Sequence, residues 1–296
     1  MGDGTPATPK RRQLTLEQRH ALYTALLIAP ATLFMLFVYA VPLAYVVSVS
    51  LADKTTGAFS IGSYQQVATS SLFYKVTWTT LQISALATIT SLLLAYPIAL
   101  YMNYQSARVR AFLMLLVLVP FWTSILVKSY AFTVIFGQAG VVNQLLGLVG
   151  LPSVKLLFNR VGVIIGMTHY LVPFLVLTIL TSLRSIPPDL PRAASIMGAS
   201  KLVVFRRVVL PLSMPGVIAG SALVFILSLG FYVVPALLGG RQDVMLANLV
   251  EFYLREALNW QMASTIAVML LLTAALFVAL LFKTRAGAAL AGEQRA

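Results

Sequence analysis

Long apolar stretches alternate along the chain with shorter polar segments. A helix that crosses a bilayer needs about 20 predominantly apolar residues. Six stretches exceed this length, and Lys128 is the one Asp, Glu, Lys or Arg residue inside them. We therefore expect an all-α integral membrane protein with about six transmembrane helices, over residues His20–Ala52, Val76–Ala107, Ala111–Phe136, Val161–Leu183, Val208–Gly240 and Ala257–Phe282.

The first apolar stretch, residues His20–Ala52, is too long for a cleaved secretory signal. The apolar part of such a signal is about 7–15 residues long, so we expect a retained membrane helix. The segment Met1–Arg19 in front of it is polar and contains Gly, Pro and a basic run, which predicts a disordered tail.

Proline occurs inside several of the expected spans. Neighbouring helices can satisfy the backbone carbonyls that lose a donor, so proline is tolerated in membrane helices. Two interpretations stay open for each proline: a kink that lines a cavity, or a simple bend. The prolines concerned are Pro30, Pro42, Pro97, Pro120, Pro173 and Pro235.

The composition agrees with a membrane location. Hydrophobic residues make up 59% of the 296 residues and charged residues 10%, whereas soluble domains carry about 25% charged residues. The absence of cysteine excludes disulfides, thiolate metal sites and cysteine nucleophiles. The two histidines, His20 and His169, belong to no cluster with metal-ligand spacing, so no metal site is predicted. We expect His169 to be a hydrogen-bonded packing residue of the fourth span, with a substrate contact as the alternative.

Membrane topology accounts for most of the net charge of +13. Cytoplasmic loops of membrane proteins are rich in Lys and Arg. With six spans and a cytoplasmic N-terminus, 14 of the 21 basic residues fall on the inner side: Lys10, Arg11, Arg12, Arg19, Arg108, Arg110, Arg184, Arg192, Lys201, Arg206, Arg207, Lys283, Arg285 and Arg295. The bias predicts an orientation in which both termini are cytoplasmic. Nucleic-acid binding is not needed to explain the charge.

Three segments on the predicted outer side are of medium length. They are Asp53–Lys75, Gly137–Arg160 and Arg241–Glu256. We expect them to form short interfacial or periplasmic helices.

The inner segment between the fourth and fifth spans differs in kind from the other loops. Residues Pro191–Gly220 predict two short helices around Gly198, where glycine permits a sharp turn. The second helix, Ala199–Val208, places Leu202 and Phe205 on one face. Pro211 and Pro215 are expected to break the path before the fifth span. An ordinary amphipathic loop on lipid headgroups remains an alternative, because basic residues attract anionic lipid by about 1 kcal/mol each.

This segment resembles the signature loop of permease subunits in ATP-binding-cassette importers. The family pattern is Glu-Ala-Ala, three residues, Gly-Ala, and then Phe, Leu-Pro and Pro-Gly at set distances. Arg192 departs from the pattern at the glutamate position, so the polar contact of that glutamate is not carried over. The matching residues are Ala193, Ala194, Gly198, Ala199, Phe205, Leu210, Pro211, Pro215 and Gly216.

The resemblance implies a coupling loop, residues 184–215, that docks on a separate ATPase subunit, with Phe205 anchoring the loop by apolar burial. The domains would be a cytoplasmic tail over 1–20, a transmembrane permease domain over 21–283 and a second cytoplasmic tail over 284–296. The implied partners are a second homologous permease subunit, two ATPase subunits, a periplasmic solute-binding protein and membrane lipid. The chain itself would hold no catalytic residue and no cofactor, because ATP and Mg²⁺ bind to the ATPase.

A second similarity, to permeases of the spermidine/putrescine-type branch, extends the likeness over about residues 25–283. It rests on Pro120–Ser124 with Lys128 and Tyr130, on Phe231–Gly240, and on Asn259-Trp260. The branch implies a polyamine-like solute and candidate pathway residues. These are Phe121, Trp122, Ser124, Lys128, Tyr130, Phe231, Tyr232 and Pro235.

The residues themselves leave the substrate open. A polyamine calls for carboxylates or aromatic faces, yet no span core contains Asp or Glu, and Gly230 stands where some polyamine permeases have an acidic residue. Lys128 lies about 25 Å along the third span from Ala111, near the expected outer boundary. It is either a structural anchor or a functional charge. The aromatic residues could equally pack between helices or lie in the interfacial belt.

Motifs that are typical of other protein classes are absent from the sequence. The sequence has no G-x-x-x-x-G-K-[ST] loop, no G-x-S-x-G and no H-E-x-x-H. An ion-coupled secondary transporter usually carries ionisable residues near the membrane midplane and internal repeats, and neither is evident. It is the main alternative to an importer permease, followed by a membrane scaffold.

Overall fold

A computed structural model of the chain describes residues 16–53 and 56–283, so the two predicted tails lie outside it except for residues 16–20. The described residues form helices and no strand. Six helical segments are long and apolar enough to span a membrane: Leu26–Ser50, Ser71–Asn103, Ile125–Leu148, Arg160–Ser185, Lys201–Leu229 and Trp260–Leu280. The prediction of an all-α protein with about six spans is confirmed.

The chain divides into two compact units, residues 1–49 and 50–296. Helix α1 (Leu16–Ser50) provides the described part of the first unit. It stays helical through Pro30 and Pro42, as membrane helices can when the freed carbonyls find other partners.

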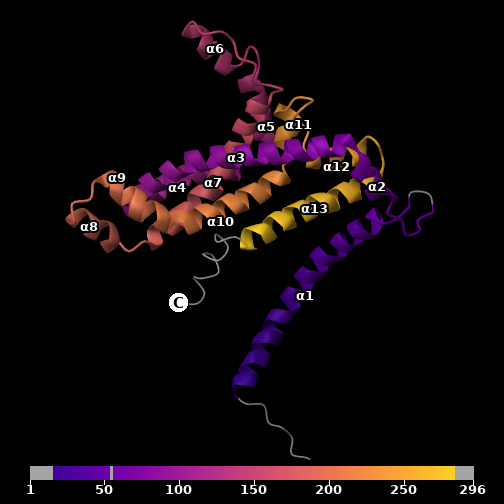
Figure 1. Cartoon of the computed structure of the whole chain (residues 1–296), viewed down its shortest axis with the longest axis horizontal. Helices are drawn as coiled ribbons and strands as arrows, with labels where there is room; N and C mark the ends of the chain where they lie inside the picture. The colour runs from indigo at the N-terminus through magenta and orange to yellow at the C-terminus, as the bar shows by residue number, and fades with distance from the viewer. Residues whose placement is uncertain (1–15, 54–55, 284–296) are drawn as a thin grey trace, which may run out of the picture. The chain divides into compact units, whose positions relative to one another are not determined.

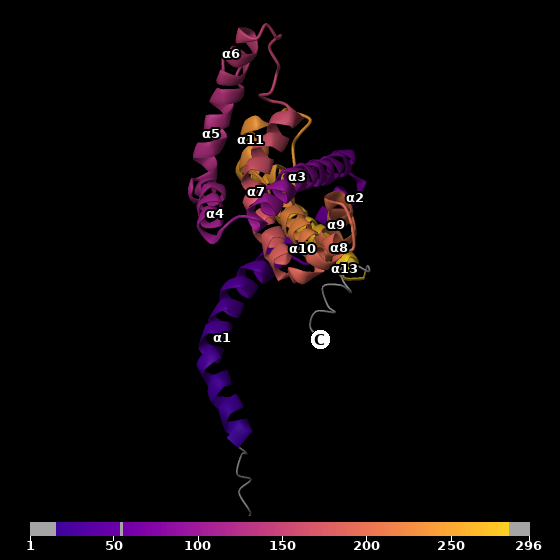
Figure 2. The ribbon, with the colours of Figure 1, turned by 90° about the vertical axis from the view of Figure 1, so that its left-hand side faces the viewer.

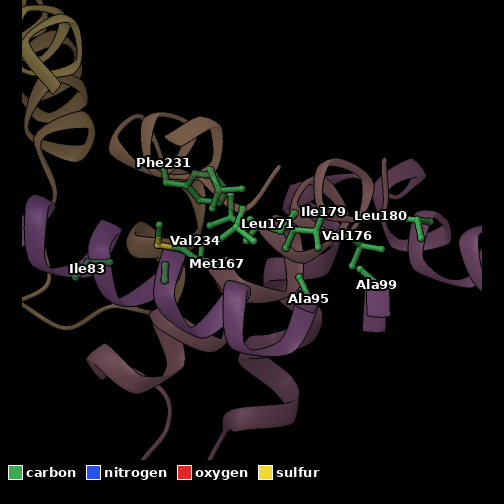
Figure 3. Close-up of a cluster of buried hydrophobic side chains, with 14 of the residues drawn as sticks. Ile83, Ala95, Ala99, Met167, Leu171, Val176, Ile179, Leu180, Phe231 and Val234 are labelled. Carbon is green, nitrogen blue, oxygen red and sulfur yellow. The ribbon is translucent and has the colours of Figure 1, made fainter. Parts of the chain in front are cut away.

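Three helices form the centre of the second unit: α3 (Ser71–Asn103), α7 (Arg160–Ser185) and α10 (Leu210–Leu229) (Figure 1). Their buried apolar side chains belong to one cluster, in which Met167 and Leu171 of α7 lie near Phe231 and Val234 (Figure 3). Burial of this cluster holds the unit together.

Small side chains on α3 explain why α7 packs closely against it. Ala87, Ser91, Ala95 and Ala99 recur at every fourth position and are fully buried. Residues four apart share one helix face, and small residues there let two membrane helices approach each other. The sequence therefore fixes which face of α3 turns inward.

The third predicted span is not one continuous helix, which corrects the expectation for Ala111–Phe136. It consists of α4 (Ala107–Trp122) and α5 (Ile125–Phe136), and α6 (Val141–Leu148) follows after a short turn. Figures 1 and 2 show α5 and α6 extending away from α3 and α10. Helix α4 ends two residues after Pro120, and the Lys128 ammonium donates to the carbonyl of that proline.

The fifth span begins earlier than predicted. Helix α9 (Lys201–Val204), a π-helical turn (Phe205–Val209) and α10 follow one another without a gap. The prediction that Pro211 and Pro215 break the path is wrong. The amide of Leu210 donates to the carbonyl of Phe205, five residues back, and this wider turn gives the Pro211 ring room within a helical path.

The fifth span also ends earlier than predicted. Helix α10 stops at Leu229, and Val233–Leu238 form a separate short helix, α11. Gly230 favours an end here because glycine is a poor helix former. The side-chain amide of Asn248 donates to the carbonyl of Tyr232 at 3.0 Å and stabilises the non-helical connection between α10 and α11.

Short helices gather at the two ends of the second unit. Helix α8 (Asp189–Ile196) and α9 lie at one end, and α2 (Gly62–Thr69) and α12 (Leu246–Arg255) lie at the other (Figure 1). Helix α13 (Trp260–Lys283) forms the last span and packs against α12. The prediction of short helices in the three outer segments is confirmed by α2, α6 and α12.

Candidate functional site

The turn between α8 and α9 is a regular helix-terminating motif built around Gly198. The amide of Gly198 donates to Ser195 at 3.0 Å, and the amide of Ala199 donates to Ala194 at 3.1 Å. This pair of bonds is the Schellman arrangement, in which the residue after the helix is left-handed. The backbone angle φ of Gly198 is +85°. The Gly-Ala pair of the sequence pattern therefore encodes a helix cap.

Crowding within this chain does not explain the glycine. A Cβ atom placed on Gly198 would meet no atom within 4 Å. The left-handed backbone alone requires glycine here, because a side chain at positive φ is strained. The open space beside the turn leaves room for another molecule.

Residues 184–215, the predicted coupling loop, have an exposed tip and an inward face. Ile196 and Met197 at the tip are 87% and 80% exposed. Ala194 and Ala199 on the inner side pack against the apolar cluster of the bundle. Exposed apolar side chains at the end of a membrane protein are typical of a docking surface.

Phe205 attaches the loop to α3 through Tyr96, a residue that sequence reasoning missed. The two rings meet edge to face with centroids 6.0 Å apart. The Tyr96 hydroxyl also lies 2.9 Å from the Ser213 hydroxyl on α10. Loop, α3 and α10 therefore meet at one side chain. The proximity of Tyr96 to Phe205 is set by the fold, so no sequence pattern reveals it.

Gly216 lies where α10 crosses α7 at close range, and Gly220 repeats the contact one turn later. A Cβ atom on Gly216 would collide with Ser182 and come within 2.8 Å of the Thr178 carbonyl. A Cβ atom on Gly220 would collide with the Thr178 hydroxyl. Glycines four residues apart are a common helix-packing motif in membranes. This contact explains the Pro-Gly element of the pattern and adds Gly220 to it.

The other matched positions lie on α8 and near the start of α10. Leu210 and Pro211 open α10, and Pro215 lies one turn further along it. The Leu210 carbonyl accepts a hydrogen bond from Ser213 at 2.9 Å. Arg192, at the position of the family's glutamate, lies 3.7 Å from Asp189, and Ala193 lies beside it on the exposed side of α8. Both charged side chains are largely exposed, so this pair contributes little to stability.

Two of the predicted pathway aromatics converge on α7. Phe121 contacts Phe174 with ring centroids 5.5 Å apart, and Phe231 contacts Tyr170 at 5.2 Å. Tyr170 and Phe174 contact each other at 5.9 Å. These four residues form an aromatic cluster. Sequence reasoning missed Tyr170 and Phe174, although their spacing of four places both rings on one helix face.

Lys128 lies at the break between α4 and α5 and contacts the aromatic cluster. Its Nζ donates to the Pro120 carbonyl at 2.7 Å and lies 4.9 Å from the centre of the Tyr170 ring. The Thr123 hydroxyl donates to the same carbonyl at 2.8 Å. In an unbroken helix this carbonyl would accept from the Ser124 amide. Lys128 and Thr123 thus replace a lost backbone bond.

The remaining third-span candidates are exposed, and of them the Trp122 ring lies edge to face with Phe121 of this cluster, with centroids 6.4 Å apart. Trp122 is 82% exposed and Tyr130 59% exposed, and Ser124 is exposed at the start of α5. The hydrogen bond expected for His169 is not found among the described residues. Its ring instead packs edge-on against Phe132 with centroids 5.5 Å apart.

Tyr232 and Pro235 line a separate cavity of about 460 Å³ at the end of the bundle that holds α2 and α12. We call it the outer cavity, because its charged residues belong to the segments predicted to lie on the outer side. Three charged side chains that sequence reasoning missed also line it: Lys75, Arg241 and Glu251. All three lie in segments outside the predicted spans, and Lys75 is the last residue before the second of these spans.

Glu251 supplies the carboxylate that the spans lack. The pKa of Tyr232 is raised, first by loss of solvation and then by the Glu251 carboxylate beside it. The phenol therefore stays protonated at neutral pH and can donate to that carboxylate. Phe252 lines the same cavity, so a carboxylate and aromatic faces meet there.

A partly buried ion pair fixes the backbone beside the outer cavity. Arg160 Nε lies 2.9 Å from Asp243 Oδ1, and its Nη1 donates to Gln82 of α3 at 3.2 Å. The other Asp243 oxygen accepts from the Gly240 amide at 3.1 Å. The segment that carries Arg241 is therefore held between α3 and α7. Within the described part of the chain, no group of His, Cys, Asp and Glu could hold a metal ion.

The chain matches a family model over residues 91–290. The family is described as "Binding-protein-dependent transport system inner membrane component".

Two curated relatives and one solved structure are similar to it. The spermidine/putrescine transport system permease protein PotB of Haemophilus influenzae is 34% identical over 209 residues, 70% of this chain and 73% of the relative. The inner membrane ABC transporter permease protein YdcU of Escherichia coli is 34% identical over 229 residues, 73% of this chain and 72% of the relative. A chain of a bacterial ABC transporter involved in the import of alginate shares the fold, with a TM-score of 0.71 at 20% identity over 88% of this chain and 94% of that chain.

Proposed function

The chain belongs to the family of binding-protein-dependent transport system inner membrane components, and from this premise we propose that it forms half of the pathway by which an ATP-driven importer moves a polyamine-like solute. Members of this family are multi-pass, non-catalytic subunits of the inner membrane, and a separate ATPase binds ATP. Membership removes the ion-coupled secondary transporter as an alternative.

The proposed assembly pairs this chain with a second, homologous permease subunit and two ATPase subunits. A periplasmic binding protein delivers the solute. One set of six spans is too small to enclose a pathway for an organic solute, which supports the pairing. The proposed domains are the cytoplasmic tails 1–20 and 284–296 and the permease domain 21–283.

The coupling role of residues 184–215 is supported above all by one observation. The exposed apolar tip at Ile196 and Met197 is capped rigidly by Gly198 and joined through Phe205 to Tyr96 of α3. A movement of a docked ATPase would therefore pass to α3 and α10 without being absorbed in a flexible loop.

Two observations support an amine as the solute. Several relatives are named for spermidine and putrescine transport. The outer cavity combines the Glu251 carboxylate with the Tyr232 and Phe252 rings, and amines bind carboxylates and aromatic faces. Lys75 and Arg241 on the same wall oppose a polycation, so the positions of its amino groups would be restricted.

The mechanism we propose is alternating access. ATP binding closes the ATPase dimer, the coupling loops move with it, and the paired permeases open outward to accept solute from the binding protein. The break at Lys128 and the connection after Leu229 are the points where α4/α5 and α10/α11 can change their relative angle.

The test is binding-protein-dependent ATPase activity of the purified complex in proteoliposomes. Polyamines, amino acids, opines and small organic acids are compared at equal concentration. We expect stimulation by spermidine or putrescine. Stimulation only by an anionic or zwitterionic solute would reject the polyamine assignment and leave the importer assignment standing.

A further inference from the structure

A groove of about 910 Å³ lies between the end of α3 and the coupling loop. Its apolar wall includes Leu100, Phe205 and the tip residue Ile196, and its polar rim includes Tyr104, Arg192 and Lys201. We call it the loop groove. Apolar and cationic surfaces adjoin in it, so a fitting ligand must be amphiphilic.

A second cavity of about 450 Å³ borders the loop groove and shares Tyr104 and Arg192 with it. It adds Arg184 from the last turn of α7. Three cationic side chains thus surround the two cavities, and among the described residues no Asp or Glu lines either. The nearest acidic partner is Asp189, 3.7 Å from Arg192 and largely exposed. The head of the ligand should therefore be anionic.

The groove lies at the level where the apolar spans end. Tyr104 follows the end of the α3 span at Asn103, Arg184 lies next to the end of the α7 span at Ser185, and Lys201 begins the fifth span. At the end of a membrane span, acyl chains give way to phosphate headgroups. Basic pockets between membrane helices on the cytoplasmic side bind anionic lipid heads.

We propose that the loop groove is a binding site for an anionic phospholipid of the inner leaflet. The phosphate lies among Arg184, Arg192 and Lys201, and an acyl chain covers the apolar wall at Leu100 and Phe205. The lipid touches both α3 and the coupling loop, so it stabilises their contact. The site depends on membrane insertion and on the proposed orientation, and it is independent of which solute is carried.

Native mass spectrometry of the purified complex tests the site, with phosphatidylglycerol and phosphatidylcholine as the probes. We expect the complex to retain phosphatidylglycerol in preference. Arg192→Ala with Lys201→Ala should weaken retention about 30-fold, because two basic contacts are lost. The charge-conserving pair Arg192→Lys and Lys201→Arg should retain the lipid.

A control pair, Lys155→Ala with Arg255→Ala, removes the same charge from exposed side chains outside the loop groove. Arg255 lies 3.5 Å from Glu251 of the outer cavity, so this pair is compared for lipid retention alone. This control should leave retention unchanged. Equal losses in the two alanine pairs, or no preference for phosphatidylglycerol, would overturn the proposal. So would retention by the isolated permease that disappears once the ATPase is bound, since the ATPase would then occupy the groove.

Lipid retention does not require transport. A complex that retains phosphatidylglycerol and ignores polyamines would uphold the lipid site and reject the proposed solute. Stimulation by polyamines without lipid preference would do the opposite.

Discussion

The backbone angle φ of Gly198 determines the shape of the proposed coupling loop. This φ of +85° suits glycine, and the space beside the residue is open. We expect Gly198→Asp to leave the protein in the membrane and to abolish solute-stimulated ATPase activity, because the side chain strains the cap and projects towards the docked subunit. Binding-protein-dependent ATPase assays and membrane fractionation measure both.

Gly150→Asp is the matched control for this substitution. Gly150 also has a positive φ, +74°, and open space around it, but it lies far from the loop in sequence. The interpretation fails if Gly150→Asp uncouples equally, if Gly198→Asp transports normally, or if Gly198→Asp cannot be inserted.

Lys128 is predicted to act as a structural side chain. We expect Lys128→Ala to lower the free energy of unfolding by about 1–2 kcal/mol, because the Pro120 carbonyl loses a charged donor. Solute uptake should fall only mildly. Thermal unfolding in detergent and uptake into proteoliposomes test this, with exposed Lys155→Ala as the control. Total loss of uptake in a stable, assembled complex would make Lys128 a substrate contact instead.

Substitutions of two residues of the outer cavity are predicted to change the concentration for half-maximal stimulation in opposite directions. If the solute is a polyamine, Glu251→Gln should raise the concentration for half-maximal stimulation about tenfold, since a charged hydrogen bond is worth about 1.5 kcal/mol. Lys75→Gln should lower it, because a like charge is removed. Titration of ATPase stimulation measures both variants. The reversed signs would indicate an anionic solute.

At the scale of elements, α10 depends on two glycines for its approach to α7. We expect Gly220→Ala to destabilise the fold by about 1–3 kcal/mol, because the added methyl group overpacks the contact with Thr178. Gly147→Ala, in α6 with no atom near, should be neutral or slightly stabilising, since alanine favours helix. Thermal unfolding followed by circular dichroism compares them. Equal stabilities of the two variants would show that α10 and α7 can move apart without loss of stability.

The helical segment from Lys201 to Leu229 also depends on a local irregularity. The π-helical turn Phe205–Val209 accommodates Pro211 and directs Phe205 towards Tyr96. Such turns often occur at functional sites. A stiff, continuous path from loop to span follows, and it is the structural basis for the coupling that we propose.

At the scale of the whole molecule, the orientation in the membrane is a prediction that the absence of cysteine makes easy to test. Ser153→Cys lies before α7 and Ser195→Cys on α8, and both serines are exposed. A membrane-impermeant maleimide should label Ser153→Cys in right-side-out vesicles and Ser195→Cys in inside-out vesicles. The opposite pattern would invert the proposed topology and place the lipid site in the outer leaflet.

Much of the architecture follows from local sequence alone. Apolar runs of sufficient length predicted six spans, because the energy of placing a helix in lipid depends on its own side chains. The capped turn at Gly198 was equally accessible, since helix caps are formed by residues close in sequence. The breaks in the helices could not be predicted in this way. An apolar run does not show that Lys128 donates to the carbonyl of Pro120, or that the side chain of Asn248 donates to the carbonyl of Tyr232.

The candidate sites divide in the same way. The sequence determined the local form of the proposed coupling loop, because its cap and its apolar tip are formed by residues that are close in sequence. Only the tertiary structure brought Tyr96 to Phe205, Tyr170 to Lys128, and Glu251 to Tyr232. These pairs lie on different helices, and their distances depend on how α3, α7, α10 and α12 pack. Packing is decided by the sum of many weak contacts, which no short stretch of sequence contains.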